Sequence, residues 1–296
     1  MEINPFVPLP QRYVVGIGEV LWDLLPEGKQ LGGAPANFAY HAGLMMGSEG
    51  CMAISAVGQD ALGDETIAAL KEHGLRALLP RVAFPTGTVV VTLTEDGIPA
   101  YEIKEGVAWD HIPLEAEILQ VAECCRAVCF GSLAQRDGDS RSTIQAFLDA
   151  TPDDCIKIFD INLRQHFYTK AIIEASLQRC NILKINDEEL EVVRPMLCQG
   201  LGEQRTEQVC RHLLETYQLD TLILTCGTQG SYVFTADTLS FLETPKVEVI
   251  DTVGAGDSFT AAFVASILQG KSVADSHRIA VQHSAYVCTQ RGAMPQ

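Results

Sequence analysis

A short segment near the C-terminus places two glycines and an aspartate directly before an apolar helix pattern. Residues 249–260 read Val-Ile-Asp-Thr-Val-Gly-Ala-Gly-Asp-Ser-Phe-Thr. Glycines let backbone N–H groups close around an anion, and the positive end of a helix dipole adds to the attraction. The N–H groups of Gly254, Ala255 and Gly256 would therefore stabilise a phosphoryl group during its transfer. Asp257, beside them, could accept the proton of an attacking hydroxyl.

The same residues have a simpler interpretation. Gly-x-Gly-Asp also describes a tight turn in which the aspartate caps a helix. Residues 246–250 alternate charged and β-branched side chains, which predicts a strand before the turn. Residues 259–268 place their apolar side chains on one helical face, which predicts a helix after it. The local pattern leaves both interpretations of Asp257 open.

A second segment combines small residues with a polar amide. Residues 32–37, Gly-Gly-Ala-Pro-Ala-Asn, open a predicted helix that extends to about residue 45. Small side chains let a ligand approach the start of this helix, and Asn37 offers both a donor and acceptors to sugar hydroxyls. A turn closed by glycines and capped by the asparagine would explain the same residues.

A third segment, Asp-Ile-Asn-Leu-Arg at residues 160–164, follows a predicted strand at 156–161. Ligands of open α/β sheets bind beyond the carboxyl ends of strands, where Asn162 and Arg164 fall. Arg164 could pair with a phosphate or a substrate carboxylate, or form an ordinary surface ion pair.

The elements that position these residues form an alternating pattern. From about residue 115 strands and helices alternate, which predicts an α/β fold with a mostly parallel sheet. Two further strands, at 89–93 and 100–103, flank the turn sequence Glu95-Asp96-Gly97 without a helix between them, so they lie outside the parallel sheet. Further strands are predicted at 13–18, 53–57, 128–132, 182–185, 222–224 and 231–234, and helices at 142–148 and 278–287.

Two other nucleotide-binding patterns are absent from the sequence. Gly16-x-Gly18 lacks the third glycine of a dinucleotide fingerprint and no helix opens after it, which argues against a dehydrogenase. No Walker A sequence and no protein-kinase catalytic loop occurs. Phosphoryl transfer would therefore depend on the Gly254–Gly256 turn.

Composition narrows the functional classes further. The chain has 296 residues and a net charge of −17, which argues against binding nucleic acid by phosphate neutralisation. Its ten cysteines include no Cys-x-x-Cys pair and no zinc spacing with histidine, so we expect reduced, mostly buried thiols in a cytoplasmic protein. No signal-peptide pattern occurs, and the longest apolar-rich run, 259–268, is too short to span a membrane.

The motifs together resemble the PfkB (ribokinase-like) carbohydrate kinase family. The string Asp-Thr-x-Gly-Ala-Gly-Asp at 251–257 is similar to its C-terminal signature, and Gly-Gly-x-x-x-Asn at 32–37 to its sugar-binding motif. The resemblance extends over about residues 13–294. It implies a ribokinase-like three-layer sandwich, with a mostly parallel central sheet flanked by helices. A single domain, 1–296, would carry a small β-sheet lid formed by roughly 19–32 and 86–108.

The resemblance also implies a role for individual residues. Asp257 would be the catalytic base, and Gly254, Ala255 and Gly256 would form the anion hole. The implied sugar-binding residues are Asp23, Gly32, Gly33, Asn37, Asn162 and Arg164. The implied nucleotide-binding residues are Asn186, Thr225, Gly227, Gly230 and His283. Glu189 would hold Mg²⁺ through water, and Asp251 with the backbone of Val253 matches a potassium site. Trp109 and Tyr101 could stack on a sugar, or belong to the lid core or a dimer contact.

Within the family, Gly18-Glu19-x-Leu21-x-Asp23 and the segments at 32–37 and 160–164 look most like bacterial fructokinases. The implied reaction transfers the γ-phosphate of ATP to a monosaccharide, most closely fructose, with Mg²⁺ and potentially K⁺ as cofactors. A 2-keto-3-deoxygluconate kinase is the first alternative, since Arg164 could clamp its carboxylate, and another sugar or nucleoside kinase of the family, such as a ribose kinase, is the second. A sugar sensor without activity is disfavoured because Asp257 is present. By analogy with the family we expect a homodimer through the lid, and neither nucleic acid nor membrane as a partner.

Overall fold

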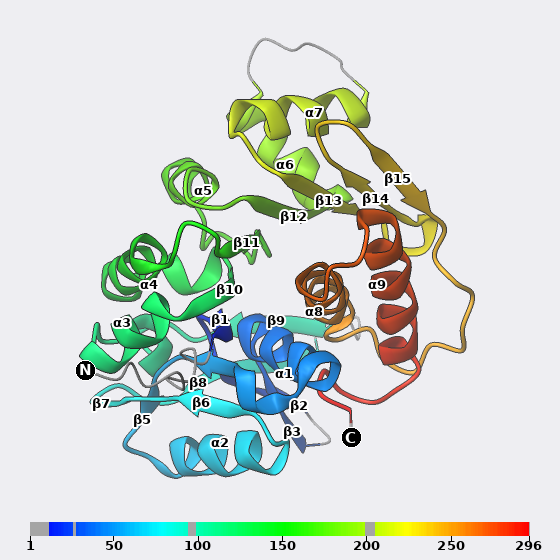
Figure 1. The fold of residues 1–296 in the computed structure, drawn as a ribbon. Helices are drawn as coiled ribbons and strands as arrows, with labels where there is room; N and C mark the ends of the chain where they lie inside the picture. Colours follow the sequence, from blue (N-terminus) through cyan, green and yellow to red (C-terminus); the bar gives the residue numbers. More distant parts are fainter. Residues whose placement is uncertain (1–11, 26–27, 94–98, 199–204, 296) are drawn as a thin grey trace, which may run out of the picture.

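The computed structural model describes residues 12–25, 28–93, 99–198 and 205–295. Within these residues a nine-stranded sheet lies between two layers of helices (Figure 1). Its strand order is β15-β14-β13-β12-β11-β10-β1-β4-β6, and only the two pairings at the β15 end are antiparallel. This confirms the predicted α/β fold with a mostly parallel sheet.

The central strands are near-continuous apolar runs because helices cover both of their faces. The strands of the large sheet are β1 (Tyr13–Ile17), β4 (Cys51–Ile54), β6 (Arg76–Leu78), β10 (Cys125–Phe130), β11 (Ile156–Asp160), β12 (Ile182–Asn186), β13 (Thr221–Thr225), β14 (Ser231–Phe234) and β15 (Leu239–Leu242). The short strands β5 (Val57–Gly58) and β7 (Arg81–Val82) pair only with each other.

Alternate residues of each strand pack against different helix layers. One face, with Ile158 and Ile223, contacts Phe38 and Phe259. The helices of this layer include α1 (Ala34–Met46), α8 (Ala255–Leu268) and α9 (Val273–Cys288). The opposite face contacts α3 (Ala116–Glu123), α4 (Gly138–Ala150), α5 (Lys170–Leu177), α6 (Asp187–Leu197) and α7 (Thr206–Thr216). The helix α2 (Ala61–Glu72) packs through Leu70 near α1; the short 3₁₀ helices are η1 (Ser48–Gly50), η2 (Ala108–Asp110), η3 (Leu133–Gln135) and η4 (Gly227–Gln229).

A separate four-stranded sheet contains the hairpin predicted from the sequence. Its order is β3 (Gly28–Gly32), β2 (Leu21–Leu25), β8 (Gly87–Leu93) and β9 (Pro99–Ile103). These strands fall within the two segments expected to form a small β-sheet, so that sheet is confirmed. The turn Glu95-Asp96-Gly97 lies outside the described residues.

The strand predicted at 246–250 is wrong. After β15 the chain makes no ladder over residues 243–249, and Val249 and Ile250 are 58% and 57% exposed. Alternation produces a strand only where a neighbouring strand accepts the backbone groups. Here the N–H groups of Ile250 and Asp251 instead lie within 2.9 and 3.3 Å of the carbonyl oxygen of Cys288, at the end of α9.

Two expectations from composition can be compared with the structure. All ten cysteines are free, and seven of them are buried, as small apolar residues would be. Across the described ranges, no helix combines the length and the hydropathy that crossing a bilayer requires.

Candidate active site

The helix α8 begins directly after a glycine in the left-handed region. Gly254 has φ +78° and is the N-cap of α8. A Cβ at this position would stand 2.8 Å from the Cβ of Ala293, so glycine is required by both the turn and its neighbour. The N–H groups of Gly256 and Asp257, in the first helical turn, have no acceptor within the helix. The N–H of Ala255 is directed to the carbonyl oxygen of Thr252, at 3.2 Å.

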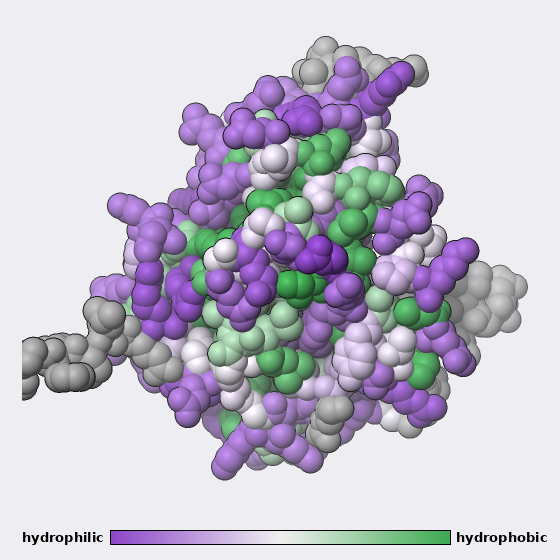
Figure 2. Space-filling model, turned by 45° about the vertical axis from the view of Figure 1, so that its right-hand side comes forward, coloured by the Kyte–Doolittle hydropathy of each residue, from purple (hydrophilic) through white to green (hydrophobic). Residues whose placement is uncertain are grey.

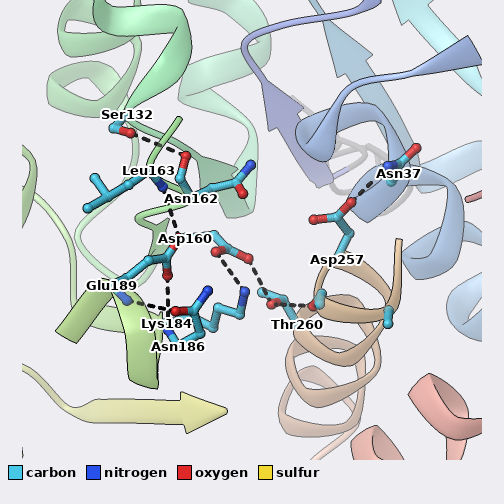
Figure 3. A network of polar contacts seen from close by, with 12 residues as sticks. Asn37, Ser132, Asp160, Asn162, Leu163, Lys184, Asn186, Glu189, Asp257 and Thr260 are labelled. Carbon is cyan, nitrogen blue, oxygen red and sulfur yellow. Dashed lines mark hydrogen bonds and ion pairs between the residues drawn. The ribbon is translucent and has the colours of Figure 1, made fainter. Parts of the chain in front are cut away.

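The predicted sugar-binding amide and the predicted base are in direct contact. Asn37 Nδ2 donates a hydrogen bond of 2.8 Å to Asp257 Oδ2 (Figure 3). Each residue lies in the first turns of its helix, and α1 and α8 pack side by side through Phe38 and Phe259. Asn37 is 3% exposed, and its Oδ1 has no partner among the described residues. An unpaired acceptor therefore lies beside the carboxylate.

The carboxyl group of Asp257 is easier to protonate than that of an exposed aspartate. Burial raises its pKa to about 6, and the negative charge of Asp160 contributes to the increase. The hydrogen bond from Asn37 and the positive charges of Lys184 and Arg164 oppose it. A carboxylate with a pKa near 6 is mostly ionised at neutral pH and is a stronger base than an exposed aspartate.

A buried ion pair lies beneath the turn, and sequence reasoning did not identify it. Lys184 Nζ is 3.0 Å from Asp160 Oδ1, and Thr260 Oγ1 donates to Asp160 Oδ2 at 3.2 Å (Figure 3). A Cβ at Gly256 would stand 3.0 Å from Lys184 Nζ, so the ammonium lies directly against the anion-binding turn. The sequence feature that could have indicated this ion pair is a lysine inside the apolar run 182–185, because a buried charge without a partner would be costly.

Two glycines directly before α1 make room for two acidic residues. A Cβ at Gly32 would stand 3.0 Å from Asp23 Oδ2, and one at Gly33 would overlap the carbonyl oxygen of Glu19. Burial raises the pKa of the half-buried Asp23, and the charge of Arg164 lowers it. The structure thus brings Asp23, Gly32 and Gly33 together, as their predicted role requires.

Glu19 is a further buried acid to which the sequence analysis gave no role. It is 2% exposed, and within the described part of the chain its Oε2 has no hydrogen-bond partner. Burial raises its pKa to about 7, the charge of Arg164 lowers it, and the charge of Asp257 raises it. The sequence feature that could have indicated a role for Glu19 is its position just after the predicted strand at 13–18.

Arg164 is the positive group shared by these acids. Its charge lowers the pKa of Glu19, Asp23 and Asp257. Its side chain is exposed and donates to the carbonyl oxygen of Leu163 at 3.0 Å. Among the ion pairs of the described residues none includes Arg164, so the simpler interpretation as a surface ion pair is not observed.

Asn162 precedes Arg164 in a strained backbone conformation. Its φ is +43°, in the left-handed region that asparagine tolerates better than most residues. Its carbonyl oxygen accepts a hydrogen bond from Ser132 Oγ at 3.5 Å, which links the ends of β10 and β11 (Figure 3).

At the start of α6, Asn186 and Glu189 form a reciprocal capping box. Asn186 Oδ1 accepts the N–H of Glu189 at 2.8 Å, and Glu189 Oε2 accepts the N–H of Asn186 at 2.9 Å (Figure 3). Glu189 Oε1 accepts the N–H of Leu163 at 2.9 Å. The Glu189 carboxylate therefore joins α6 to the Arg164 segment. A role in holding a magnesium-bound water stays a prediction.

The other predicted nucleotide residues lie around the β13–β14 turn and on α9. Thr225 ends β13, Gly227 has φ +51°, and Gly230 has φ +126° with no room for a Cβ beside Leu242. His283 is half-buried, and its Nε2 is 3.1 Å from His41 Nδ1, so this nitrogen points toward α1.

Asp251 and Val253, predicted as potassium ligands, are tied to the C-terminal residues. Asp251 Oδ1 accepts the N–H of Val253 and Oδ2 accepts the N–H of Gly292, each at 3.0 Å. The carboxylate therefore joins the approach to α8 with the chain that follows α9.

The two aromatic residues considered for sugar stacking, Trp109 and Tyr101, differ in their exposure. Trp109 is fully buried, with Arg136 4.0 Å from its ring centre, so it belongs to the core and cannot stack on a sugar. Tyr101 is 59% exposed on β9.

Exposed apolar side chains gather between β15 and α9. Figure 2 shows apolar surface, in green, on the side of the molecule that carries α9 and the segment before α8. The exposed large apolar residues of this region are Leu239, Phe241, Val247, Val249, Ile250, Val253 and Tyr286. Exposed apolar side chains can contact one face of an aromatic ligand.

Comparisons with known proteins agree with this geometry. The sequence profile described as pfkB family carbohydrate kinase matches residues 27–296. The chain is 25% identical over 299 residues to an ATP-dependent 6-phosphofructokinase of Thermoanaerobacterium thermosaccharolyticum, covering 95% of this chain and 89% of the relative. It is 26% identical over 311 residues to fructokinase-1 of Oryza sativa subsp. japonica, covering 95% and 93%.

Solved structures show the same fold. An uncharacterized sugar kinase of Pyrococcus horikoshii superposes with a TM-score of 0.80 and 25% identity, covering 96% of this chain and 95% of that one. A fructokinase of Xylella fastidiosa with bound ATP gives a TM-score of 0.79 at 19% identity, covering 97% and 94%. The predicted resemblance and the predicted ribokinase-like fold are both confirmed.

Proposed function

The chain belongs to the pfkB family of carbohydrate kinases, and from that premise we propose that it transfers the γ-phosphate of ATP to a hydroxyl of fructose. The observation that carries this proposal is the 2.8 Å contact between Asn37 and Asp257 at the start of α8. A hydroxyl held by the amide of Asn37 would lie next to the base that must deprotonate it and to the N–H groups that must stabilise the phosphoryl group.

The sugar would bind between α1 and the small sheet. Asp23, Gly32 and Gly33 line this side, and the unpaired Oδ1 of Asn37 offers an acceptor to a sugar hydroxyl. Asn162 and Arg164 would complete the site from the carboxyl end of β11.

ATP would lie along the β12–β13 end of the sheet, with its γ-phosphate at the Gly254–Gly256 turn. Asn186, Thr225, Gly227 and Gly230 would contact the phosphates and ribose. His283 and the apolar surface between β15 and α9 would contact the base.

Two cations fit the residues that are present. Magnesium keeps several of its waters, and Asn186 and Glu189 would hold it through such a water, since their side-chain oxygens already accept backbone N–H groups. Magnesium would neutralise phosphate charge when bound. Asp251 and the backbone carbonyl of Val253 are oxygen donors suited to K⁺.

The protein residues would perform the transfer without a covalent intermediate. Asp257 accepts the hydroxyl proton as the sugar oxygen attacks the γ-phosphorus and the bond to the ADP oxygen breaks. The N–H groups of the turn and the ammonium of Lys184 stabilise the charge that develops on the transferred group.

Fructose is favoured by the motifs at 18–23, 32–37 and 160–164 and by relatives named fructokinases. A 2-keto-3-deoxygluconate kinase is the second candidate, because the exposed Arg164 has no carboxylate partner among the described residues and could bind the carboxylate of such a substrate. A non-catalytic sugar sensor is the least supported, since Asp257 and its surroundings are suited to proton transfer.

A coupled assay of ADP formation with Mg²⁺ tests the proposal. Fructose, fructose 6-phosphate, 2-keto-3-deoxygluconate, ribose and a nucleoside are compared by kcat/KM. We expect the highest value for fructose, and a kcat for Asp257→Asn that is about 10²–10⁴-fold below that of the wild type. A higher kcat/KM for the keto acid would select the second candidate. Binding of a sugar without turnover of any member of the panel would indicate a sensor.

A further inference from the structure

The residues that follow α9 return to the start of α8. Gly292 donates its N–H to Asp251 Oδ2 at 3.0 Å. Ala293 packs directly on Gly254, where a Cβ would stand 2.8 Å from the Cβ of Ala293 and 3.1 Å from its carbonyl oxygen. Met294 is buried in a core cluster with residues of α1. The backbone at 292–294 therefore forms one wall of the anion-binding turn.

Two neighbouring side chains of α1 hold this wall in place. His41 Nε2 is 2.8 Å from the carbonyl oxygen of Ala293, and the hydroxyl of Tyr40 donates to the carbonyl oxygen of Pro295. His41 is completely buried. Both residues lie one turn after Asn37 on the same helix. The helix that carries the sugar-binding amide therefore also holds the C-terminal residues.

The hydrogen bonds define the protonation of the histidine pair. A carbonyl oxygen only accepts, so His41 Nε2 must carry a proton toward Ala293. His41 Nδ1 then accepts the proton of His283 Nε2, 3.1 Å away. Burial lowers the pKa of His41 to about 4 and also lowers that of His283, so both rings are neutral at pH 7. His41 thus has one donating contact and one accepting contact, made by different nitrogens.

We propose that His41 is a positioning residue for phosphoryl transfer: through its hydrogen bond to Ala293 it holds the C-terminal wall against Gly254. The inference rests on the proposed function of the turn. Glycine reaches φ +78° without strain but can adopt many other conformations, so the neighbouring residues must restrict Gly254 to this one. The N–H groups that follow must be placed to within a fraction of an ångström for the transition state, and small displacements are costly. His41 thereby aligns the phosphate site with the sugar site of its own helix.

Two isosteric substitutions separate the contacts of His41. In His41→Gln the amide nitrogen takes the place of Nε2 and can still donate to Ala293. In His41→Asn the amide takes the place of Nδ1, so the contact with His283 is kept and the bond to Ala293 is lost. His41→Ala removes both contacts.

We expect His41→Asn and His41→Ala to lower kcat about tenfold, the ratio that corresponds to one hydrogen bond of ordinary net strength. The KM for the sugar should change little, because Asn37 stays in place. His41→Gln should keep most of the wild-type kcat. His277→Asn is the matched control: this equally buried histidine of α9 contacts Ser231 and Ser240, each at 2.8 Å, and its ring packs edge-on against Phe259 of α8, so its hydrogen bonds go to β14 and β15 and not to residues 292–295. It should lower Tm while leaving kcat nearly unchanged.

A purely structural role would give a different result. The four variants would then lose activity in proportion to their loss of Tm, with His41→Gln no better than His41→Asn, and that outcome would overturn the proposal. A loss expressed mainly in the KM for the sugar would also overturn it.

Hydrogen exchange measured by mass spectrometry tests, without an activity assay, whether His41 holds residues 292–294 in place, an effect called the clamp below. The backbone N–H groups of residues 289–294 should exchange faster in His41→Asn and His41→Ala than in the wild type and in His41→Gln. Unchanged exchange would refute the clamp even in an active enzyme. Faster exchange in a protein that phosphorylates no sugar would instead refute the proposed function and leave the clamp supported.

Discussion

The ammonium of Lys184 lies 3.0 Å from the carboxylate of Asp160, within the sheet and directly beneath the turn that opens α8. Both side chains are less than a tenth exposed. The charge of Asp160 raises the pKa of Lys184 and offsets the opposing effect of burial, so the lysine is charged. A fixed positive charge against an anion-binding turn is suited to stabilising a phosphoryl group as it moves.

Replacing Lys184 should remove both stability and turnover. In Lys184→Met the carboxylate of Asp160 is left buried without its partner, which costs about 3–5 kcal/mol of unfolding free energy. The double variant Lys184→Met with Asp160→Asn removes the unpaired charge and should recover most of this stability. We expect its kcat to stay about 10²–10³-fold below the wild type, because the positive charge is still missing. Urea unfolding and steady-state kinetics of the two variants measure the two effects, and recovery of kcat in the double variant would contradict a role for the ammonium in transfer.

Asp257→Asn should separate binding from chemistry. The substituted amide can orient its oxygen toward Asn37 Nδ2 and keep the 2.8 Å contact, so the site is expected to retain its shape. Without a base, kcat should fall about 10²–10⁴-fold. Calorimetric titration with the sugar and with a non-hydrolysable ATP analogue should give dissociation constants close to those of the wild type. A variant that turns over at a near-normal rate would show that another group removes the proton.

The structure shows why the sequence identified some of these residues and missed others. Gly254 and Asp257 are neighbours in the chain, so their spacing offers phosphoryl transfer as one of two interpretations, and the family resemblance favours it. The contact between Asn37 and Asp257 crosses 220 residues, and only the family resemblance had placed them in one site. Asp160 had been read as the end of a strand, because nothing in its own segment indicates that Lys184 lies beside it.

The errors in the sequence analysis have the same origin. For Trp109 the sequence left two interpretations open, stacking on a sugar or a place in the core, and burial of its ring beside Arg136 decides for the core. In the segment 246–250, charged and β-branched side chains alternate as in a strand, but no neighbouring strand pairs with it. Its last residue, Ile250, instead donates to the carbonyl oxygen of Cys288 at the end of α9. Burial and pairing depend on distant residues, which a local pattern does not describe.

Glu19 should make the stability of the protein fall as the pH rises. Its pKa is about 7 in the folded protein and near 4.5 when exposed, so the folded state binds more protons between these values. Stability therefore decreases as pH increases from 4.5 to 7, by an amount that could reach about 3 kcal/mol. Glu19→Gln cannot ionise and escapes this loss. We expect its Tm to exceed that of the wild type at pH 8 and to match it at pH 4. Equal Tm differences at the two pH values would show that Glu19 does not titrate in this range.

Arg164→Ala should change both the pH profile and the choice of substrate. The charge of Arg164 lowers the pKa of Asp257, whose value is about 6, so its removal should raise that pKa. The base must be ionised to act, and the acidic limb of kcat/KM should therefore move to higher pH. Arg164→Lys keeps a charge and should keep the wild-type limb.

The same variant separates the two candidate substrates. If Arg164 binds a substrate carboxylate, Arg164→Ala should lower kcat/KM for 2-keto-3-deoxygluconate about 10–100-fold, since a hydrogen-bonded charge pair is lost. Fructose has no carboxylate, so at a pH well above the acidic limb its kcat/KM should change far less. Arg164→Lys provides the control, because a lysine retains the charge but not the planar, two-pronged geometry that fits a carboxylate. Equal losses for both substrates at that pH would indicate that Arg164 acts on Asp257 and on the shape of the site, and that it does not select the sugar.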